Sequence, residues 1–473
     1  MKTAAVFGSN ASGKSNLLNA LKTVKKIVTD QNFWLDSPIR YWGNTNPATD
    51  FSITFQVDNK QFRYDLSIDA VSNRASHEHE VKYYPMVDSE SLFCRKIKKD
   101  RVCTSWYPVF EHLISEEQRD KIDSLLKDAE SVRRRIVKIN DQVRRCDIKL
   151  NEVRHSTNEK NNYADTYELL VEKRNSLISK RRVLSERLES NNRLLIYYKP
   201  ILFSKKIDRS DLSHFTKSET KELIDSAYQW FACGLFVVGT DDFYYPLNNP
   251  ETIEYLSDIM NSLDVGIKQI QWTMINPGNT KVLKELRKSI TEKDSERLTK
   301  LKLQSATDST MITTIVRTSD GLSKFEYWSG EESVYLLSID HEDKNRESSK
   351  ITAESDGTRR LLELASILMP AKHDTVFLID EIDRKMHPLL TRRLLELYRE
   401  RADPRKQLIF TSHELSLMDQ DLLIPDEIWL VDKGSKGSQL VCMGTLPVEY
   451  NDVLNRIYAS DPSIIGKPIF KKR

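Results

Sequence analysis

An eight-residue motif near the start of the chain, G-x-x-x-x-G-K-S over residues 8–15, constrains this sequence more than any other feature. A short apolar segment, residues 4–7, precedes it, and an apolar helical pattern, residues 16–21, follows it. This strand–loop–helix context is the one in which the motif cradles phosphates. Its glycines let backbone N–H groups turn toward phosphate oxygens, and the helix N-terminus adds partial positive charge. We therefore expect a nucleotide-binding P-loop.

The residues of this loop divide into a backbone cradle, a cation and a metal ligand. Lys14 is expected to bridge the β- and γ-phosphates of ATP, and Ser15 is expected to hold Mg²⁺. The residues expected to bind the nucleotide are Gly8, Asn10, Ala11, Ser12, Gly13, Lys14, Ser15 and Asn16.

The bulk composition excludes several classes of protein. A chain of 473 residues is long enough for two or three domains, and its net charge of +2 gives no global attraction to nucleic acid. The five cysteines are scattered without a C-x-x-C pair, which suits reduced thiols and argues against structural zinc. No apolar run approaches the ~20 residues of a membrane span, and the first strand leaves no room for a signal peptide. We expect a cytoplasmic protein without a membrane partner.

Strand and helix signals then follow in turn along the chain. Residues 51–69 alternate apolar and polar on both sides of Asp58 and Asn59, which predicts a β-hairpin. From about residue 115 apolar residues recur every three or four positions, and they form a seam along one side of a helix. A polar tip follows at residues 156–162. A second, weaker run comes after it, in which polar residues take some of the seam positions. This pattern predicts an antiparallel coiled-coil hairpin that ends at Pro200. The apolar seam consists of Ile122, Leu125, Ala129, Val132, Ile136, Ile139, Val143, Cys146, Leu150, Val153, Leu170, Leu177, Leu184, Leu188 and Leu195, and its polar members are Arg174, Arg181 and Asn191.

The predicted hairpin is the basic part of the chain. Residues 119–199 hold 20 lysines and arginines against 13 aspartates and glutamates, a net charge of +7. Two interpretations stay open: a solvated coiled-coil surface, or a surface that contacts nucleic acid or an acidic partner.

Two apolar strands in the last quarter of the sequence end in groups suited to hydrolysis. Residues 374–379 lead into Asp380 and Glu381, and residues 407–412 lead into His413. Asp380 is expected to orient the Mg²⁺ shell, and Glu381 to polarise the water that attacks the γ-phosphate. His413 is placed to reach the γ-phosphate and sense its loss.

A second anion site is expected just before these strands. Residues 354–360 read E-S-D-G-T-R-R, and a helix is expected over residues 361–369, capped by Ser355 or Asp356 and stopped by Pro370. A capped helix start with a glycine suits an anion. Because it does not easily reach the P-loop of its own chain, we expect Ser355, Asp356 and Gly357 to serve the γ-phosphate of a neighbouring copy.

The order of these motifs resembles a known group of ATPases. The order is a P-loop, a helical insertion, S-D-G-T-R, L-I-D-E-I-D and T-S-H. This order resembles that of the ABC-type ATPases that include SMC and DNA-repair coiled-coil proteins. The chain is more similar to AAA-like ATPases of bacterial abortive infection, of the RloA and AbiL kind. Their relatives include ATPase subunits of the PARIS, Septu and overcoming-lysogenisation-defect defence systems. His387, Pro388 and the tail at residues 464–470 match as well.

The resemblance implies an architecture and a domain layout. The fold is expected to be α/β, a P-loop ABC-type ATPase head with a mostly parallel core sheet and an antiparallel strand region, interrupted by an α-helical coiled-coil hairpin. The expected parts are an N-terminal ATPase lobe (1–113), the coiled-coil hairpin (114–199), a mixed α/β segment packing on the head (200–345) and a C-terminal ATPase lobe (346–473).

Two departures from the family pattern matter. Family members carry two strands before the P-loop strand, whereas only seven residues precede Gly8. We expect the contacts to the adenine base to be altered, through a late start or a truncation. Only 60 residues follow His413, fewer than a typical domain of about 100–150 residues. The effector, such as a nuclease or toxin, is therefore expected to be a separate protein.

Three functions fit these observations. The first is an ATPase switch in anti-phage defence that assembles head to tail around ATP and Mg²⁺. The second is an SMC-like ATPase of DNA repair that grips DNA with its basic arm, which DNA-stimulated turnover would favour. The third is a scaffold that binds ATP structurally, and absence of turnover would favour it. A small-molecule kinase would leave Glu381 and His413 unexplained.

Overall fold

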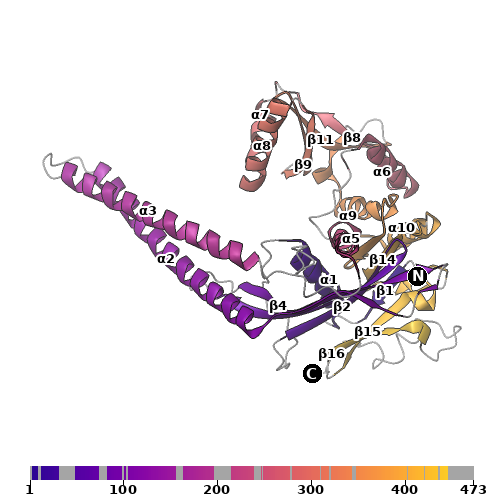
Figure 1. Cartoon of the computed structure of the whole chain (residues 1–473). Coiled ribbons are helices and arrows are strands. Elements are labelled where there is room, and N and C mark those ends of the chain that lie inside the picture. Colours follow the sequence, from indigo (N-terminus) through magenta and orange to yellow (C-terminus); the bar gives the residue numbers. More distant parts are fainter. Residues whose placement is uncertain are drawn as a thin grey trace, which may run out of the picture. The chain divides into compact units, whose positions relative to one another are not determined.

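Figure 1 presents the computed structural model of the chain. The structure describes residues 3–8, 12–30, 48–73, 82–98, 101–102, 105–155, 163–196, 215–238, 247, 249–276, 278, 280–308, 310–318, 321–342, 348–401, 403–419, 421–434 and 437–445. Contacts divide the chain into two units, one of Met1–Ala20 and Gly234–Arg473 and the other of Leu21–Cys233. The boundary falls inside α1 (Lys14–Thr29), the helix that follows the P-loop.

A six-stranded sheet forms the core of the first unit. Its order is β16-β15-β1-β14-β13-β7, and all neighbours are parallel except β15 and β16. β1 is buried throughout, as expected of a strand covered on both faces. The strands are β1 (Thr3–Phe7), β7 (Leu235–Val238), β13 (Thr375–Ile379), β14 (Lys406–Thr411), β15 (Ile428–Gly434) and β16 (Gly437–Cys442).

Helices pack against this sheet through one apolar core, which joins buried side chains of the strands with those of α6, α9 and α10. Each of these helices begins at a capping side chain, Asn249, Ser355 and His387 respectively. The helices are α6 (Pro250–Ser262), α9 (Asp356–Leu364) and α10 (Pro388–Glu400), and the short 3₁₀ turns are η3 (Ile351–Ala353), η4 (Ala365–Leu368), η5 (Leu415–Leu417), η6 (Pro425–Glu427) and η7 (Met443–Thr445).

An antiparallel sheet is also part of this unit. Helices α7 (Thr280–Lys288) and α8 (Glu292–Asp308) pack on it through a second apolar cluster. Asp264 and Gly266 have positive φ angles of 52° and 70° just before its first strand, so the chain turns there. The strands are β8 (Ile267–Met274), β9 (Ile312–Thr318), β10 (Gly321–Trp328), β11 (Glu331–His341) and β12 (Ser349–Lys350).

The second unit contains its own antiparallel sheet. Strands β2 and β3 pair from Ala48–Asp69 to Val57–Lys60 around a turn at residues 58–59, so the predicted hairpin is confirmed. Helix α5 (Lys217–Gln229) leads into a π-helical turn, η2 (Trp230–Gly234), where the Trp230 ring stacks on Phe55 with centroids 4.1 Å apart. The strands are β2 (Ala48–Val57), β3 (Lys60–Asn73), β4 (Lys82–Lys98), β5 (Arg101–Val102) and β6 (Tyr107–Leu113).

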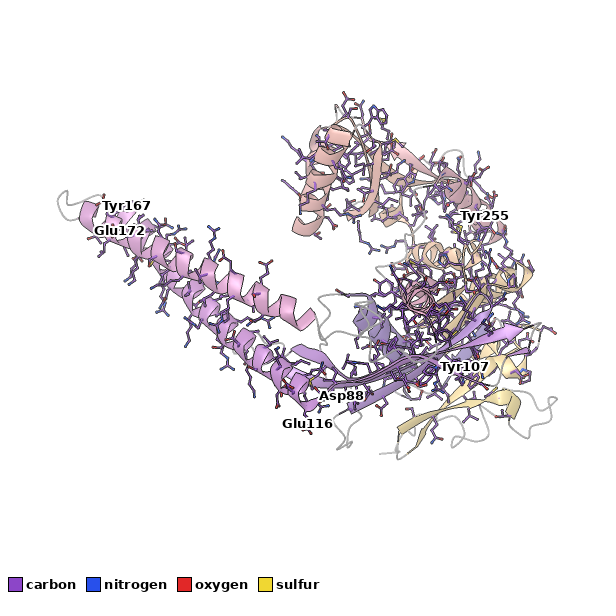
Figure 2. The ribbon with its side chains drawn as sticks, in the orientation of Figure 1. Asp88, Tyr107, Glu116, Tyr167, Glu172 and Tyr255 are labelled. Carbon is purple, nitrogen blue, oxygen red and sulfur yellow. The ribbon has the colours of Figure 1, made fainter. Side chains whose placement is uncertain are left out.

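Two long helices, α2 (Glu116–His155) and α3 (Tyr163–Ile196), run side by side as an arm of the second unit (Figure 1). Figure 2 labels Asp88 and Glu116 near the base of the arm. Arg119 forms an ion pair with Asp88 there, and Ile122 and Leu126 pack on Met86 of β4. The predicted apolar seam residues Ala129, Val132, Cys146, Leu177 and Leu184 are buried.

Polar residues of the predicted seam pair across the two helices. Arg187 and Asn191 both donate to Asp128, over 2.6 and 2.7 Å, and Arg174 donates to Asp147 over 2.5 Å. These pairs match the late part of α3 with the early part of α2, so the helices are antiparallel. Regular coiled-coil packing along the whole arm stays a prediction, and its predicted tip, residues 156–162, lies outside the described residues.

The predicted α/β fold class, with a mostly parallel core sheet and antiparallel strands, is confirmed. The predicted helix at residues 361–369 is wrong in its bounds. Because the Ser355 hydroxyl accepts from Thr358 N, α9 already begins at Asp356, and the extended backbone of Met369 before Pro370 leaves only a 3₁₀ turn after Leu364. The four-part domain layout stays a prediction. Among the described residues, no helix is long and apolar enough to cross a membrane.

Candidate nucleotide-binding site

The carboxyl ends of three parallel strands, β1, β14 and β13, meet at one edge of the core sheet. The P-loop follows β1, His413 lies two residues after β14, and Asp380 and Glu381 follow β13. Ligands in open parallel sheets bind outside this edge. The topology therefore brings together the motifs that lie up to about 400 residues apart in the sequence.

The described part of the P-loop holds a buried cation. Lys14 is 5% exposed, and its Nζ donates to Gly8 O over 2.7 Å. Burial lowers the pKa of Lys14, while the carboxylates of Asp380, Glu381 and Asp383 oppose that shift. The loop therefore holds a buried ammonium group within electrostatic reach of the three carboxylates.

The glycines and a buried hydroxyl shape the loop. A Cβ at Gly8 would lie 2.8 Å from Ser12 Oγ, so the backbone can take this path only without a side chain there. Ser12 Oγ is itself buried and makes no hydrogen bond within the described structure. Gly13 has a φ of 111°, and a Cβ there would lie 2.7 Å from the Ser438 hydroxyl of β16, which donates to Ser12 O. These features fit a phosphate cradle.

Three consecutive residues at the end of β14 contact three carboxylates that follow β13. The Thr411 hydroxyl donates to Asp380 Oδ1 over 2.5 Å, and the Ser412 hydroxyl donates to Asp383 Oδ1 over 2.7 Å. His413 Nε2 lies 3.9 Å from Glu381 Oε1. Each carboxylate therefore has a defined position relative to the strand beside it.

The backbone of Glu381 is held in an unusual conformation. Its φ of 50° lies in the left-handed region, which costs energy for a residue other than glycine. Its N–H donates to Thr411 Oγ1 over 2.8 Å, and the next amide, of Ile382, donates to Thr411 O over 3.0 Å. β14 thus fixes the direction in which the half-exposed Glu381 side chain leaves the chain.

The predicted second anion site lies at the start of α9. Asp356 forms ion pairs with Arg359 and with Lys385, the latter over 2.9 Å. A Cβ at Gly357 would lie 2.9 Å from Lys385 O, so this glycine permits a close approach within the chain itself.

A partly buried histidine anchors Glu354, the residue before the N-cap of this helix. His341 Nε2 lies 2.9 Å from Glu354 Oε1, and Ser349 donates to the same oxygen. These bonds tie the start of α9 to the antiparallel sheet.

The structure brings Lys14, Asp380, Glu381 and His413 to one edge of the sheet. It records no direct contact from Ser15, Asn16, Ser355 or Gly357 to that group, and Asn10 and Ala11 lie outside the described residues. No cluster of three or more His, Cys, Asp or Glu in the described chain is arranged to hold a metal ion. A Mg²⁺ site beside a P-loop needs no such cluster, because water and phosphate supply most of its ligands.

Sequence reasoning missed four residues of the site. Thr411 and Ser412 were part of an apolar strand pattern, and Asp383 was only one acid in an acidic run. Their contacts depend on β13 and β14 being neighbours in the sheet, which no local sequence pattern reveals. For Ser438, which is 426 residues from its partner Ser12, no local pattern exists.

A family model described as "AAA domain, putative AbiEii toxin, Type IV TA system" matches residues 4–419. The chain belongs to this family. The match spans the P-loop, the carboxylates that follow β13 and His413, so the AAA domain includes these parts of the candidate site.

Solved structures similar to this AAA-family chain include heads of SMC proteins. One is an Smc head domain with an extended coiled coil from Pyrococcus furiosus, bound to the C-terminal domain of ScpA. It is 14% identical, with 93% of this chain and 89% of that chain covered and a TM-score of 0.30. Another, the SMC head domain from Thermotoga maritima, is 11% identical, with coverages of 94% and 89% and a TM-score of 0.29. No match was found among curated proteins.

Proposed function

We propose that this protein is a Mg²⁺-dependent ATPase that works as a nucleotide-driven switch. The observation that supports the proposal most is the ordered contact of Thr411, Ser412 and His413 with three carboxylates, close to the buried Lys14. A phosphate cradle alone would suffice to bind a nucleotide without hydrolysing it. A fixed carboxylate and a histidine at the same edge suit hydrolysis.

Each residue has a stated role in this proposal. The P-loop amides and Lys14 bind the β- and γ-phosphates of ATP. Ser15 and Asp380 hold Mg²⁺, which supplies charge neutralisation on the phosphates when it is bound. Glu381 polarises the attacking water, and its left-handed backbone directs the carboxylate. His413 is close enough to Glu381 to respond to a change in that carboxylate.

We further propose that two copies assemble head to tail around ATP. In this arrangement Ser355, Asp356 and Gly357 of one copy face the γ-phosphate bound by the other. The exposed position of Ser355 and Asp356 at a helix start supports the idea, since helix starts attract anions. ATP would then close the assembly, and hydrolysis would open it.

The cellular role that we propose is anti-phage defence with a separate effector such as a nuclease or toxin. The family description names a toxin of a type IV toxin–antitoxin system, and the motif order is similar to that of abortive-infection ATPases. The arm of α2 and α3 is the proposed contact for the effector.

The second candidate is an SMC-like ATPase that binds DNA through this arm. The net charge of +7 over residues 119–199 favours it. Part of that charge is used inside the arm, because Arg174 and Arg187 pair with Asp147 and Asp128. DNA-stimulated turnover would distinguish this candidate from the first.

The test of the nucleotide site is isothermal titration of the full-length protein with ATP and Mg²⁺. Lys14→Ala removes the buried ammonium group and should abolish ATP binding at the P-loop. Lys433→Ala, in β15, serves as a lysine control outside the motif. Unchanged affinity of the Lys14→Ala protein would refute the assignment of the P-loop as the nucleotide site.

A further inference from the structure

A cavity of about 390 Å³ lies beside the candidate nucleotide site, within the first unit. Its walls come from β9, β10, η3, α9 and the segment that follows β13. Asp380 is part of the wall, whereas none of the described P-loop residues is. The cavity therefore adjoins the proposed catalytic edge without being the phosphate cradle itself.

The lining of this cavity is unusually rich in cationic groups. Five basic side chains line it, Arg317, Arg359, Arg360, Arg384 and Lys385, against three acidic ones. The basic groups come from three separate segments of the chain, so the excess positive charge is a property of the fold. Because like charges repel, their convergence on one cavity favours an added anion there.

The acidic lining residues orient three of the basic ones, and Arg384 lies 4.0 Å from Glu381 Oε2. Asp356 pairs with Arg359 and Lys385, and Glu363 accepts from Arg360 Nη1 over 3.1 Å. Arg360 Nη2 also donates to Asp380 O over 3.2 Å. These contacts hold the guanidinium groups in fixed positions around the cavity.

Two guanidinium groups retain unused donors in this wall. Arg360 is 7% exposed, and its Nε is buried without a hydrogen-bond partner in the described structure. Arg359 Nε is in the same state. A buried donor without an acceptor is costly, and a small shift of either side chain toward a ligand oxygen would remove that cost.

We propose that this cavity is an additional anion site, which binds the phosphate groups of a small phosphorylated ligand. Its volume lies within the ~300–1,000 Å³ range of small-molecule sites. Arginine forks match phosphate oxygens in pairs, and fixed guanidinium groups lose little entropy on binding. The carbonyl contact from Arg360 to Asp380 links the site to the catalytic edge.

The test uses full-length Lys14→Ala protein, in which the P-loop cation is absent, and titrates it with pyrophosphate. One pyrophosphate should bind, with an affinity that falls as salt rises. Adding Arg359→Gln should weaken binding by at least about tenfold, the value of one charge-assisted hydrogen bond. Arg393→Gln is the matched control, since both arginines are 43% exposed and pair with a carboxylate three residues away.

Arg317→Gln provides an independent variant, because Arg317 is exposed on β9 and its loss should not disturb α9. It should also weaken pyrophosphate binding while Arg393→Gln does not. Titration with ADP in place of pyrophosphate separates the two sources of phosphate: tighter ADP binding supports a nucleotide, and equal binding supports a free phosphate anion.

The proposal is overturned if the Lys14→Ala protein binds neither probe, or if the Arg359→Gln and Arg317→Gln proteins bind as the Arg393→Gln control does. Failure of the proposed ATPase function would look different. In that case the wild-type protein would not hydrolyse ATP, while the arginine variants would still bind pyrophosphate more weakly.

Discussion

The Thr411 hydroxyl donates a hydrogen bond of 2.5 Å to Asp380 Oδ1, and through the same oxygen it accepts from the Glu381 amide. One side chain of β14 therefore positions both carboxylates that follow β13. Thr411 itself is completely buried. It acts on the proposed chemistry only by holding Asp380 and Glu381.

Replacing this hydroxyl should slow hydrolysis more than it weakens nucleotide binding. Thr411→Val keeps the shape of the side chain but leaves the Asp380 carboxylate and the Glu381 amide without their partner. We expect turnover to fall by about 10–100-fold, as small misplacements of catalytic groups do, and stability to fall by about 1–3 kcal/mol. Thr411→Ser, which retains the hydroxyl, is the control. Steady-state kinetics would contradict this role if the valine and serine variants turned over equally fast.

Nucleotide binding should take up protons at alkaline pH. Burial lowers the pKa of Lys14 in the free protein, and bound phosphates would raise that pKa. Between the two pKa values the complex holds more protons than the free protein, so affinity should fall as pH rises through this window. Calorimetry in buffers of different ionisation enthalpy measures the uptake. A Lys14→Arg protein, whose side chain stays charged, should show none of it.

Lys406 should make the protein more stable as pH rises above 8. Burial lowers the pKa of Lys406 from 10.5 to about 8, while its Nζ donates to Ile367 O and Met369 O over 2.7 and 2.8 Å. A neutral amine can still donate both bonds. Between pH 8 and 10.5 the unfolded chain binds the extra proton, so stability rises by up to about 3 kcal/mol from this group. Chemical unfolding across this range should show the rise in wild type and a smaller one in Lys406→Met.

The arm can be tested apart from the ATPase site. Replacing residues 122–195 with a short Gly/Ser linker should leave ATP binding intact, because the motifs lie outside the arm. We expect the shortened protein to lose its partner or its activity in cells. Full defence activity would show that the arm is dispensable.

Basic residues of the arm distinguish a nucleic-acid partner from a protein effector. If DNA binds there, Arg133, Arg134 and Arg135 release counterions, so their joint replacement by Gln should reduce both affinity and its salt dependence. If a protein effector binds the apolar seam and tip, the same changes should be nearly neutral. Arg174 pairs with Asp147 inside the arm, so its replacement is the control that separates an effect on folding of the arm from a loss of DNA contacts.

Sequence patterns predicted Asp380, Glu381 and His413 at the ends of two buried strands, because apolar runs of this kind are typical of parallel sheets. That both ends lie at one sheet edge follows from the pairing of β13 with β14. The contacts of Thr411 and Ser412 could not be predicted, since they depend on which strands are neighbours. Gly357 shows another limit. The sequence suggests an anion site for a neighbouring copy, whereas the structure gives this glycine a reason within its own chain, the 2.9 Å approach of Lys385 O to the position of a Cβ.

Long helices could be predicted from the sequence, whereas the exact start of a short one could not. The antiparallel helices of the arm were predictable from their long heptad pattern. The start of α9 was not, because a single hydrogen bond from Thr358 N to Ser355 decides it.

The most direct test of the account is ATP turnover by purified full-length protein compared with its Glu381→Gln variant, with ATP affinity measured on both. The amide cannot polarise water, so the account predicts retained ATP binding, turnover lowered by at least about 100-fold, and a larger species in gel filtration with ATP. Glu400→Gln, an exposed change on α10, is the control and should behave as wild type. Hydrolysis by the Glu381→Gln protein at the wild-type rate would contradict the account.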